Sequence, residues 1–238
     1  MKTKDPRKYY DEFSTMYEDE RAKPYHVFLD ESEIDAARPY CQGGHVLEVG
    51  CGTGLVLERL EQISGKVTGI DLSHGMVAKA GQRGLAVAQA SATDLPFADD
   101  TFDCAVSFKV LAHIPPIHET LAECARVVRP GGHLVLEFYN KHSMRHMVKL
   151  LKPAQKVATS TTDDQVYTRY DSLAEIRNYL PAGVRIVKSV GIRCLAPTYH
   201  FYNAPVVGRV TVGLEKAIQR TPLSRIGGFL VVIAQVEG

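Results

Sequence analysis

The fold of this 238-residue chain is decided by the stretch Val46-Leu47-Glu48-Val49-Gly50-Cys51-Gly52-Thr53-Gly54. The apolar residues at its start predict a buried strand, and the spacing of apolar side chains in residues 55–60 predicts a helix directly after the glycines. Glycines permit a sharp turn and let a ligand come within contact distance of the main chain. The stretch therefore predicts a strand, a turn that binds a nucleotide, and a helix.

The spacing of these glycines indicates which nucleotide is bound. A dinucleotide-binding loop has the pattern G-x-G-x-x-G, and Leu55 stands where its third glycine would be. Asp71 ends the next apolar run, about twenty residues past the loop, where a carboxylate can accept hydrogen bonds from both ribose hydroxyls. NAD is thus disfavoured. The plainer alternative is a strand-to-helix turn in which Asp71 caps a helix beside Ser73.

A wider pattern connects these residues to a known family. The pattern E-x-G-x-G-x-G followed by Val67-Thr68-Gly69-Ile70-Asp71 resembles the first two motifs of the class I S-adenosylmethionine-dependent methyltransferases. Later segments are similar to the family's adenine-side loop, its fourth strand with the segment after it, and the turn before its fifth strand: they are 91–97, 101–114 and 129–132. The four motifs lie in order within the central two-fifths of the chain, and they match best the small-molecule and quinone-type branch.

The resemblance implies S-adenosylmethionine as cofactor, S-adenosylhomocysteine as product, and no metal ion. Relatives carry Asp or Asn where this chain has Ser91, so adenine recognition here falls to the Ser91 hydroxyl through water or to the Ala92 backbone. The candidate cofactor-binding residues are Glu48, Gly50, Gly52, Gly54, Asp71, Leu72, Ser91, Ala92, Ser107 and Tyr17.

Methyl transfer from a sulfonium is an in-line displacement, which needs mainly correct positioning and the exclusion of water. If the acceptor is a hydroxyl or an amine, a base can remove its proton, and His113 is the best-placed candidate because it lies just past the fourth predicted strand. A packing or hydrogen-bonding role is the alternative for this histidine. Weaker candidates are His142, His200, Tyr10 and Tyr139.

The order of apolar runs predicts the architecture. Runs that alternate with helical patterns imply parallel strands joined by crossovers, and they occur near 45–50, 66–71, 84–89, 102–108, 133–139, 184–190 and 229–236. The expected fold is α/β: a Rossmann-like, seven-stranded, mostly parallel doubly wound sheet with helices on both faces, plus lid-like insertions. Ligands of such sheets bind beyond the carboxyl ends of the strands.

Residues 1–40 are expected to form a helical cover segment, and residues 41–238 a single methyltransferase domain with insertions at about 140–170 and 194–227. Tyr9, Tyr10, Phe13 and Tyr17 form an aromatic stripe, which indicates either a helix that covers the core or a gate over the cofactor. Further helices are predicted over 143–151 and 205–219, and a capping box at 172–175 marks another helix start.

Composition limits the possible partners. A net charge of +1 disfavours general nucleic-acid affinity, and no Asn/Asp-Pro-Pro-Tyr motif of nucleic-acid methylation follows the fourth predicted strand. Five cysteines without C-x-x-C spacing predict neither a zinc site nor a full disulfide framework and favour a reducing cytoplasm. No run approaches the roughly 20 apolar residues that span a bilayer, so a soluble chain is expected.

Charge is unevenly distributed: residues 1–140 have a net charge of −7 and residues 141–238 a net charge of +8. The positive part favours an anionic acceptor. Lys141, Arg145, Lys149 and Lys152 share one helical face, for which a solvated surface is the favoured interpretation over a contact with an anionic substrate or a membrane surface. The predicted function is methyl transfer to a small molecule, and the alternative is a non-catalytic cofactor-binding partner or scaffold. The acceptor, the atom methylated and the oligomeric state stay open.

Overall fold

The computed structural model describes residues 5–19, 21–151, 156–158, 161–162, 165–196 and 198–237. Its helices are α1 (Pro6–Ser14), α2 (Pro24–Cys41), α3 (Leu55–Glu61), α4 (His74–Gln82), α5 (Ile117–Val127), α6 (Met144–Leu151), α7 (Leu173–Tyr179), α8 (His200–Asn203) and α9 (Pro205–Ile218), with short 3-10 helices η1 (Leu111–His113) and η2 (Pro222–Ile226). Its strands are β1 (His45–Val49), β2 (Lys66–Asp71), β3 (Val87–Gln89), β4 (Phe102–Ser107), β5 (Val128–Tyr139), β6 (Lys156–Ala158), β7 (Thr161–Thr162), β8 (Val184–Ile192) and β9 (Phe229–Val236).

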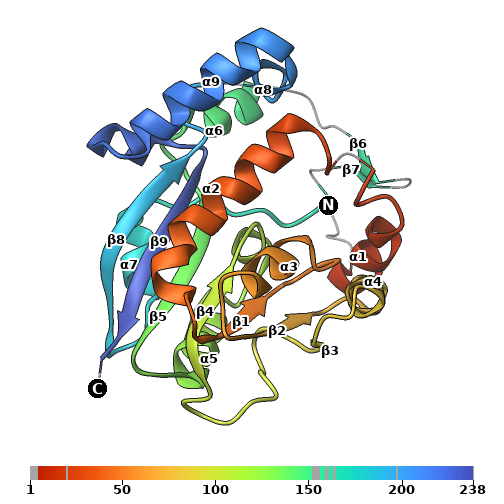
Figure 1. Ribbon diagram of the computed structural model, residues 1–238, viewed down its shortest axis with the longest axis vertical. Helices are drawn as coiled ribbons and strands as arrows, with labels where there is room; N and C mark the ends of the chain where they lie inside the picture. The colour runs from red at the N-terminus through yellow and green to blue at the C-terminus, as the bar shows by residue number, and fades with distance from the viewer. Residues whose placement is uncertain are drawn as a thin grey trace.

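Seven of these strands form one sheet in the order β3-β2-β1-β4-β5-β9-β8 (Figure 1). Strands β1 to β5 pair in parallel, and β9 is antiparallel to both β5 and β8. The predicted seven-stranded, mostly parallel doubly wound fold is confirmed. The strand order reverses beside β1, so the carboxyl ends of β1 and β4 lie at the position where such sheets bind ligands.

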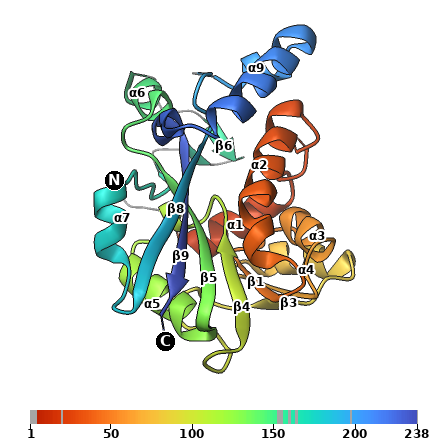
Figure 2. The same cartoon turned by 60° about the vertical axis from the view of Figure 1, so that its left-hand side comes forward.

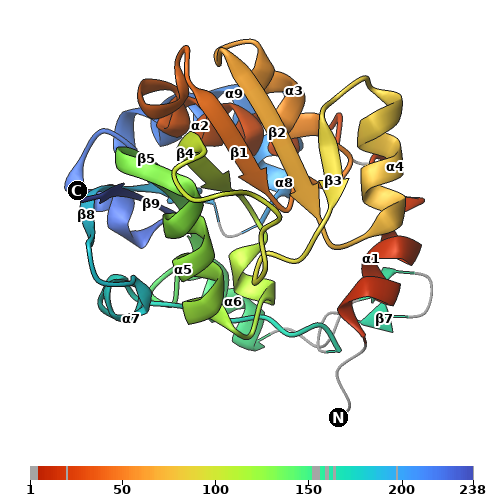
Figure 3. The ribbon, with the colours of Figure 1, turned by 90° about the horizontal axis from the view of Figure 1, so that it is seen from below.

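The sheet is buried on both faces because neighbouring side chains of a strand point to opposite sides. In β1, Val46 belongs to a core cluster with Phe28 of α2 and Leu57 of α3, whereas Leu47 belongs to a second cluster with Leu121 of α5. Viewed from below, α2 and α3 lie on one side of the sheet and α5 and α7 on the other (Figure 3). Helices on both faces explain why the central strands are almost continuously apolar.

Two strands differ from their predicted bounds. The run predicted as a strand over 84–89 pairs only from Val87, because Gly84 takes a left-handed φ of +82° in the turn after α4. The predicted turn at 129–132 lies within β5, where the pairing partners jump from Phe102 with Val128 to Cys104 with His133. Residues 129–132 therefore form a bulge in a longer strand.

The segments outside the core motifs gather at the end of the molecule toward which the parallel strands run (Figures 1 and 2). Helix α6 follows β5, and α8, α9 and η2 lie between β8 and β9, so the predicted helices over 143–151 and 205–219 are confirmed within a residue. The capping box is also confirmed, since Ser172 and Glu175 each accept from the other's backbone N–H. The division at residue 40 stays a prediction. Within the described residues, every helix is too short or too polar to cross a membrane.

Candidate cofactor and active site

The loop between β1 and α3 contains three glycines with left-handed backbones, and they lack a side chain for two different reasons. A Cβ on Gly50 would overlap Val110, and a Cβ on Gly54 would lie 2.5 Å from Leu85 Cδ1, so both glycines permit close packing. A Cβ on Gly52 would meet only Tyr17 Cε1, at 3.9 Å. Gly52 therefore faces open space, which belongs to a cavity of about 660 Å³.

This cavity lies where the parallel strands end. Its walls come from the ends of β1 and β2, from residues 90–93 and 108–116, from α1 and the start of α2, and from residues 166–170. Aromatic side chains contribute much of the lining: they are Tyr9, Tyr10, Phe13, Tyr17, Tyr25, Phe108, Tyr139, Tyr170 and Phe229. A site of this size and character can enclose a nucleoside-like ligand together with a small apolar acceptor.

Asp71 fixes the glycine loop and faces the cavity. Its Oδ2 accepts from the Gly52 N–H at 2.9 Å, and its Oδ1 accepts from the Ser73 N–H at 2.9 Å. Burial raises the pKa of this carboxyl, and the backbone donors oppose that effect. Each carboxylate oxygen can accept a second hydrogen bond, so both the predicted ribose contact and the plainer turn-forming role fit this geometry.

Glu48 lines the cavity, and one of its carboxylate oxygens has no hydrogen-bond partner within the described residues. Its side chain is buried, and Oε2 has no hydrogen bond among the described residues. Burial raises the pKa of Glu48 well above its ordinary value. A buried, unpaired carboxyl oxygen beside a cavity is a ready acceptor for a cationic N–H of a ligand.

A cluster of charges borders Glu48. Lys109 Nζ lies 2.7 Å from Glu33 Oε2 and 3.0 Å from Asp30 Oδ1, while Arg21 lies 2.6 Å from Asp30 Oδ1. Glu137 on β5 accepts from the Lys109 N–H at 3.1 Å. Burial raises the pKa of Glu33 and of Glu137. With Glu48, carboxyl groups outnumber the two cations, so this wall favours a ligand that carries positive charge.

The predicted adenine-side residues Leu72, Ser91 and Ala92 also line the cavity. Ser91 Oγ forms a hydrogen bond with Thr93 Oγ1 at 2.7 Å, and this bond holds residues 91–93 in place. Two predicted residues lie elsewhere. Gly54 begins α3 behind the loop, and Ser107 is fully buried and donates to the Val49 carbonyl at 2.9 Å, which joins β4 to the end of β1.

The aromatic stripe at the N-terminus lies over the cavity. Asp11 of α1 accepts from Ser73 Oγ at 2.6 Å and from the Gly75 N–H at 3.1 Å, so α1 is fixed to the start of α4. Tyr17 follows α1 and covers the space in front of Gly52. Burial raises the pKa of Tyr17 and of Tyr10, so both phenols stay neutral at pH 7. Both interpretations of the stripe agree with this position.

His113 ends η1 and lines the cavity. Its Nδ1 lies 2.8 Å from the Tyr167 carbonyl oxygen, which can only accept, so Nδ1 carries the proton. Nε2 therefore presents a lone pair, and it faces Tyr139 Oη at 3.3 Å. Burial lowers the pKa of His113 and keeps the ring neutral at pH 7. Nε2 is thus able to take a proton from an acceptor group that displaces the Tyr139 hydroxyl.

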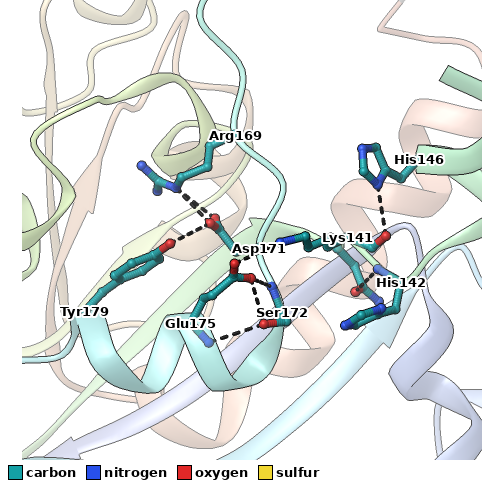
Figure 4. A network of polar contacts seen from close by, with 9 residues as sticks. Lys141, His142, His146, Arg169, Asp171, Ser172, Glu175 and Tyr179 are labelled. Carbon is teal, nitrogen blue, oxygen red and sulfur yellow. Dashed lines mark hydrogen bonds and ion pairs between the residues drawn. The ribbon is translucent and has the colours of Figure 1, made fainter. Parts of the chain in front are cut away.

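The segment before α7 holds η1 in position, and Figure 4 shows the ion pair of Arg169 with Asp171 in this segment. Arg169 Nε donates to both oxygens of the buried Asp171 at 2.9 Å, and Tyr179 Oη donates to Asp171 Oδ1 at 3.0 Å. The other guanidinium nitrogens donate to the Leu111 and Ile114 carbonyls, both at 3.1 Å. This buried ion pair therefore ties residues 169–171 to the short helix that carries His113.

Arg145 and Lys149 of α6 line the cavity, which corrects the favoured prediction of a solvated face. The Arg145 guanidinium lies 4.1 Å from the centre of the Tyr139 ring and 4.6 Å from that of Phe229, because the helix turns its charged side inward. Lys141 precedes α6 and pairs with Glu175 at 2.9 Å (Figure 4). Lys152 lies outside the described residues.

Of the weaker base candidates, Tyr10 and Tyr139 line the cavity and His142 and His200 do not. Burial raises the pKa of Tyr139 to about 12, which makes its phenol a hydrogen-bond donor rather than a base at pH 7. Sequence reasoning missed the roles of Lys109, Arg21 and Arg169. A single charge within the apolar stretch after the fourth strand is the one signal that marks Lys109. Arg169 donates to carbonyls more than fifty residues away, and no pattern in the sequence indicates these contacts.

A family model described as "Methyltransferase domain" matches residues 47–136. Residues 47–136 are therefore a methyltransferase domain. A "Phosphatidylethanolamine N-methyltransferase" of Cereibacter sphaeroides is 41% identical over 109 residues, and the match covers 42% of this chain and 53% of that protein. A "Ubiquinone biosynthesis O-methyltransferase" of Alkalilimnicola ehrlichii is 31% identical over 117 residues, 46% of this chain and 47% of that protein. The chain spans about half the length of the curated relatives it matches.

A solved structure shares the whole architecture of the methyltransferase domain and its flanks. It is a "SAM-dependent methyltransferase, possible histamine N-methyltransferase" of Thermotoga maritima, with a TM-score of 0.70 and 20% identity over 97% of this chain and 99% of that chain. At this identity the likeness concerns the fold alone.

The cofactor of a class I methyltransferase domain is S-adenosylmethionine, and the cavity fits it. Gly52 leaves room for a ligand against the main chain, and Asp71 offers carboxylate oxygens. The unpaired Glu48 oxygen suits an ammonium group, and the surplus of carboxyl groups suits a molecule that carries both an ammonium and a sulfonium. Within the described residues, His, Cys, Asp and Glu form no group of three that could hold a metal ion.

Proposed function

We propose that this protein is an enzyme that transfers a methyl group from S-adenosylmethionine to a small-molecule acceptor with an anionic group. The observation that carries the proposal is one cavity lined by two sets of residues. Gly52, Asp71 and Glu48 come from β1, β2 and the glycine loop, and His113 and Arg145 come from the segments after β4 and β5. Cofactor and acceptor would thus lie side by side. A cavity of about 660 Å³ favours a small molecule over nucleic acid as the acceptor.

The bound cofactor supplies an electrophilic methyl group. The protein holds the cofactor, excludes water from the cavity and provides a base. Asp71 and the glycine loop would hold the ribose, Glu48 the ammonium group, and Leu72, Ser91 and Ala92 the adenine. The aromatic side chains of Tyr10, Phe13, Tyr17 and Tyr139 exclude water, which favours an in-line displacement. His113 Nε2 would accept the proton that a hydroxyl acceptor loses.

The rate of this reaction should depend on pH through His113. Only the neutral ring can accept a proton, and burial lowers the pKa of His113 below the ordinary value of about 6.5. The rate with a hydroxyl acceptor should therefore stay level as the pH falls from about 8 to 6.5 and decline only at lower pH. Steady-state rates of the wild type and of His113→Gln across this range test the prediction. An identical acid decline in His113→Gln would assign the titration to another group.

The preference for an anionic acceptor rests on Arg145 and Lys149. Among the described residues, the Arg145 guanidinium donates one long hydrogen bond, to Tyr170 Oη at 3.4 Å. Its other N–H groups can therefore donate to a ligand. Replacing either residue by Gln should raise KM for an anionic acceptor about tenfold, because a charge-assisted hydrogen bond contributes about 1.5–3 kcal/mol. The Kd for S-adenosylhomocysteine should not change.

Lys141→Gln is the matched control, since Lys141 pairs with Glu175 and does not line the cavity. KM should also rise with ionic strength in the wild type and less so in the two Gln variants. Equal KM values in all three variants, with no salt dependence in the wild type, would contradict an anionic acceptor.

The proposed activity is tested by incubating the protein with methyl-labelled S-adenosylmethionine and a metabolite extract, then separating labelled products. Label in a small anionic product, absent with Asp71→Ala, supports the proposal. Cofactor binding without transfer to any metabolite would favour the alternative of a non-catalytic binding partner. A cytoplasmic location is part of the proposal, and the five cysteines, all buried and unpaired, support it.

A further inference from the structure

Helix α9 is arranged in the opposite way to an ordinary surface helix. Such helices bury their apolar residues and expose their polar ones. In α9 the fully buried side chain is Glu215, whereas apolar side chains are exposed on the other side: Val206 (75%), Val210 (59%) and Leu214 (54%) at intervals of four residues, with Val207 (50%) beside them. The helix therefore presents an apolar surface to the solvent.

Helix α9 is nevertheless firmly attached to the body of the protein. The Glu215 carboxylate accepts from the Cys194 and Leu195 N–H groups, both at 2.8 Å, and from Tyr202 Oη at 2.6 Å. Gly208 packs so closely on the Tyr202 carbonyl that a Cβ could not fit there. These contacts fix the orientation of α9, so its apolar side is presented in a defined direction.

Helix α6 shows the same inversion at the same end of the molecule. Arg145 and Lys149 face the cavity, while Met147 (64%), Leu150 (72%) and Leu151 (85%) are exposed. In two views α6 and α9 lie at the end toward which β5 runs (Figures 1 and 2). The segments directly before and after α9 add exposed apolar side chains: Tyr199, Phe201, Leu223 and Ile226. We call this set, with the exposed residues of α6 and α9, the apolar end.

The segments that form the apolar end carry mainly positive charge. The described residues of 144–151 and 198–226 include exposed Arg209, Arg220 and Arg225, and their single acidic residue is the buried Glu215. Lys216 is also exposed and pairs with Glu31 of α2 at 3.4 Å. Exposed apolar and aromatic side chains match the apolar interior of a bilayer, and the Lys and Arg side chains near them match an anionic outer layer. A typical soluble partner would not match both properties over two separate helices.

We propose that the apolar end docks on anionic phospholipid bilayers, with α6 and α9 inserted to the level of the headgroups. Docking places the cavity that Arg145 and Lys149 line next to the lipid. An acceptor dissolved in the bilayer would then reach the cavity without crossing water. The proposal concerns partition of the protein itself, so it holds or fails independently of methyl transfer.

The test is co-sedimentation of the full chain with phosphatidylcholine vesicles that contain or lack phosphatidylglycerol. The wild type should sediment with the anionic vesicles, and added salt should weaken this binding. Leu150→Ser with Leu151→Ser should weaken it more than about tenfold, since two exposed leucines lose their apolar contact. Arg209→Gln with Arg220→Gln should weaken it about fivefold for each cation removed.

Val187→Ser and Lys188→Gln are matched controls, because both residues are exposed on the edge strand β8 and lie outside the apolar end. Both controls should bind like the wild type, and circular dichroism should show every variant folded. Equal binding to neutral and anionic vesicles, or no effect of the α6 and α9 substitutions, would overturn the proposal. So would a vesicle-free dimer that Leu150→Ser with Leu151→Ser abolishes, since a second copy would then occupy this surface.

Discussion

Replacing Gly52 by Val is expected to abolish cofactor binding while the protein stays folded. A side chain at this position projects into the cavity rather than into the protein, because nothing lies within 3.9 Å of a Cβ built there. Overpacking costs about 1–3 kcal/mol for small intrusions, and a branched side chain against a rigid ligand should exceed this range, so affinity should fall at least about a hundredfold. Isothermal titration with S-adenosylhomocysteine measures the loss.

The variant also strains the backbone, since Gly52 has a φ of +55°. Gly84→Val is the matched control, because Gly84 has a φ of +82°, has open space around a Cβ, and does not line the cavity. Both variants should lose similar stability, on the order of 1–2 kcal/mol for the left-handed backbone. If Gly52→Val binds as tightly as Gly84→Val, the glycine loop does not approach the ligand.

Replacing Arg169 by Met is expected to lower the free energy of unfolding by about 3–5 kcal/mol. The substitution leaves the buried Asp171 carboxylate with Tyr179 Oη as its remaining side-chain donor, and it removes the donors to the Leu111 and Ile114 carbonyls. Urea denaturation followed by circular dichroism measures the change.

Arg185→Met is the control, because the pair of Arg185 with Glu237 at 3.2 Å is exposed. Its loss should cost less than about 1 kcal/mol. Adding Asp171→Asn to Arg169→Met should restore part of the stability, since the uncompensated charge is then gone. Equal effects of Arg169→Met and Arg185→Met would mean that the buried pair does not stabilise the segment around His113.

The sequence predicted the sheet well because its strands depend on local patterns. Apolar runs of five to six residues, such as β1 and β2, are bounded by turn residues, and their bounds agree with prediction almost to the residue. The ends of those strands are followed by Gly50 and Gly52 or coincide with Asp71. Predicting the strands therefore also predicted where these residues lie. Gly54 and Ser107 share the pattern, and only packing partners distant in sequence show that they lie behind the loop.

The surroundings of His113 and Lys109 were harder to predict because their contacts join distant parts of the chain. Arg169 reaches η1 across more than fifty residues, and Lys109 pairs with carboxylates of α2. The periodicity of α6 was visible in the sequence, but its direction was not. Amphipathic spacing gives the two faces of a helix and leaves open which one points inward, and here the charged face does.

The central claim is that the cavity binds S-adenosylmethionine, and the most direct test is isothermal titration of the wild-type protein with S-adenosylhomocysteine and, separately, with NAD. Gly52, Asp71 and Glu48 predict binding of S-adenosylhomocysteine with a micromolar Kd at one site per chain, and no heat from NAD. Tighter binding of NAD, or no binding of S-adenosylhomocysteine by the folded protein, would contradict the assignment of this cavity.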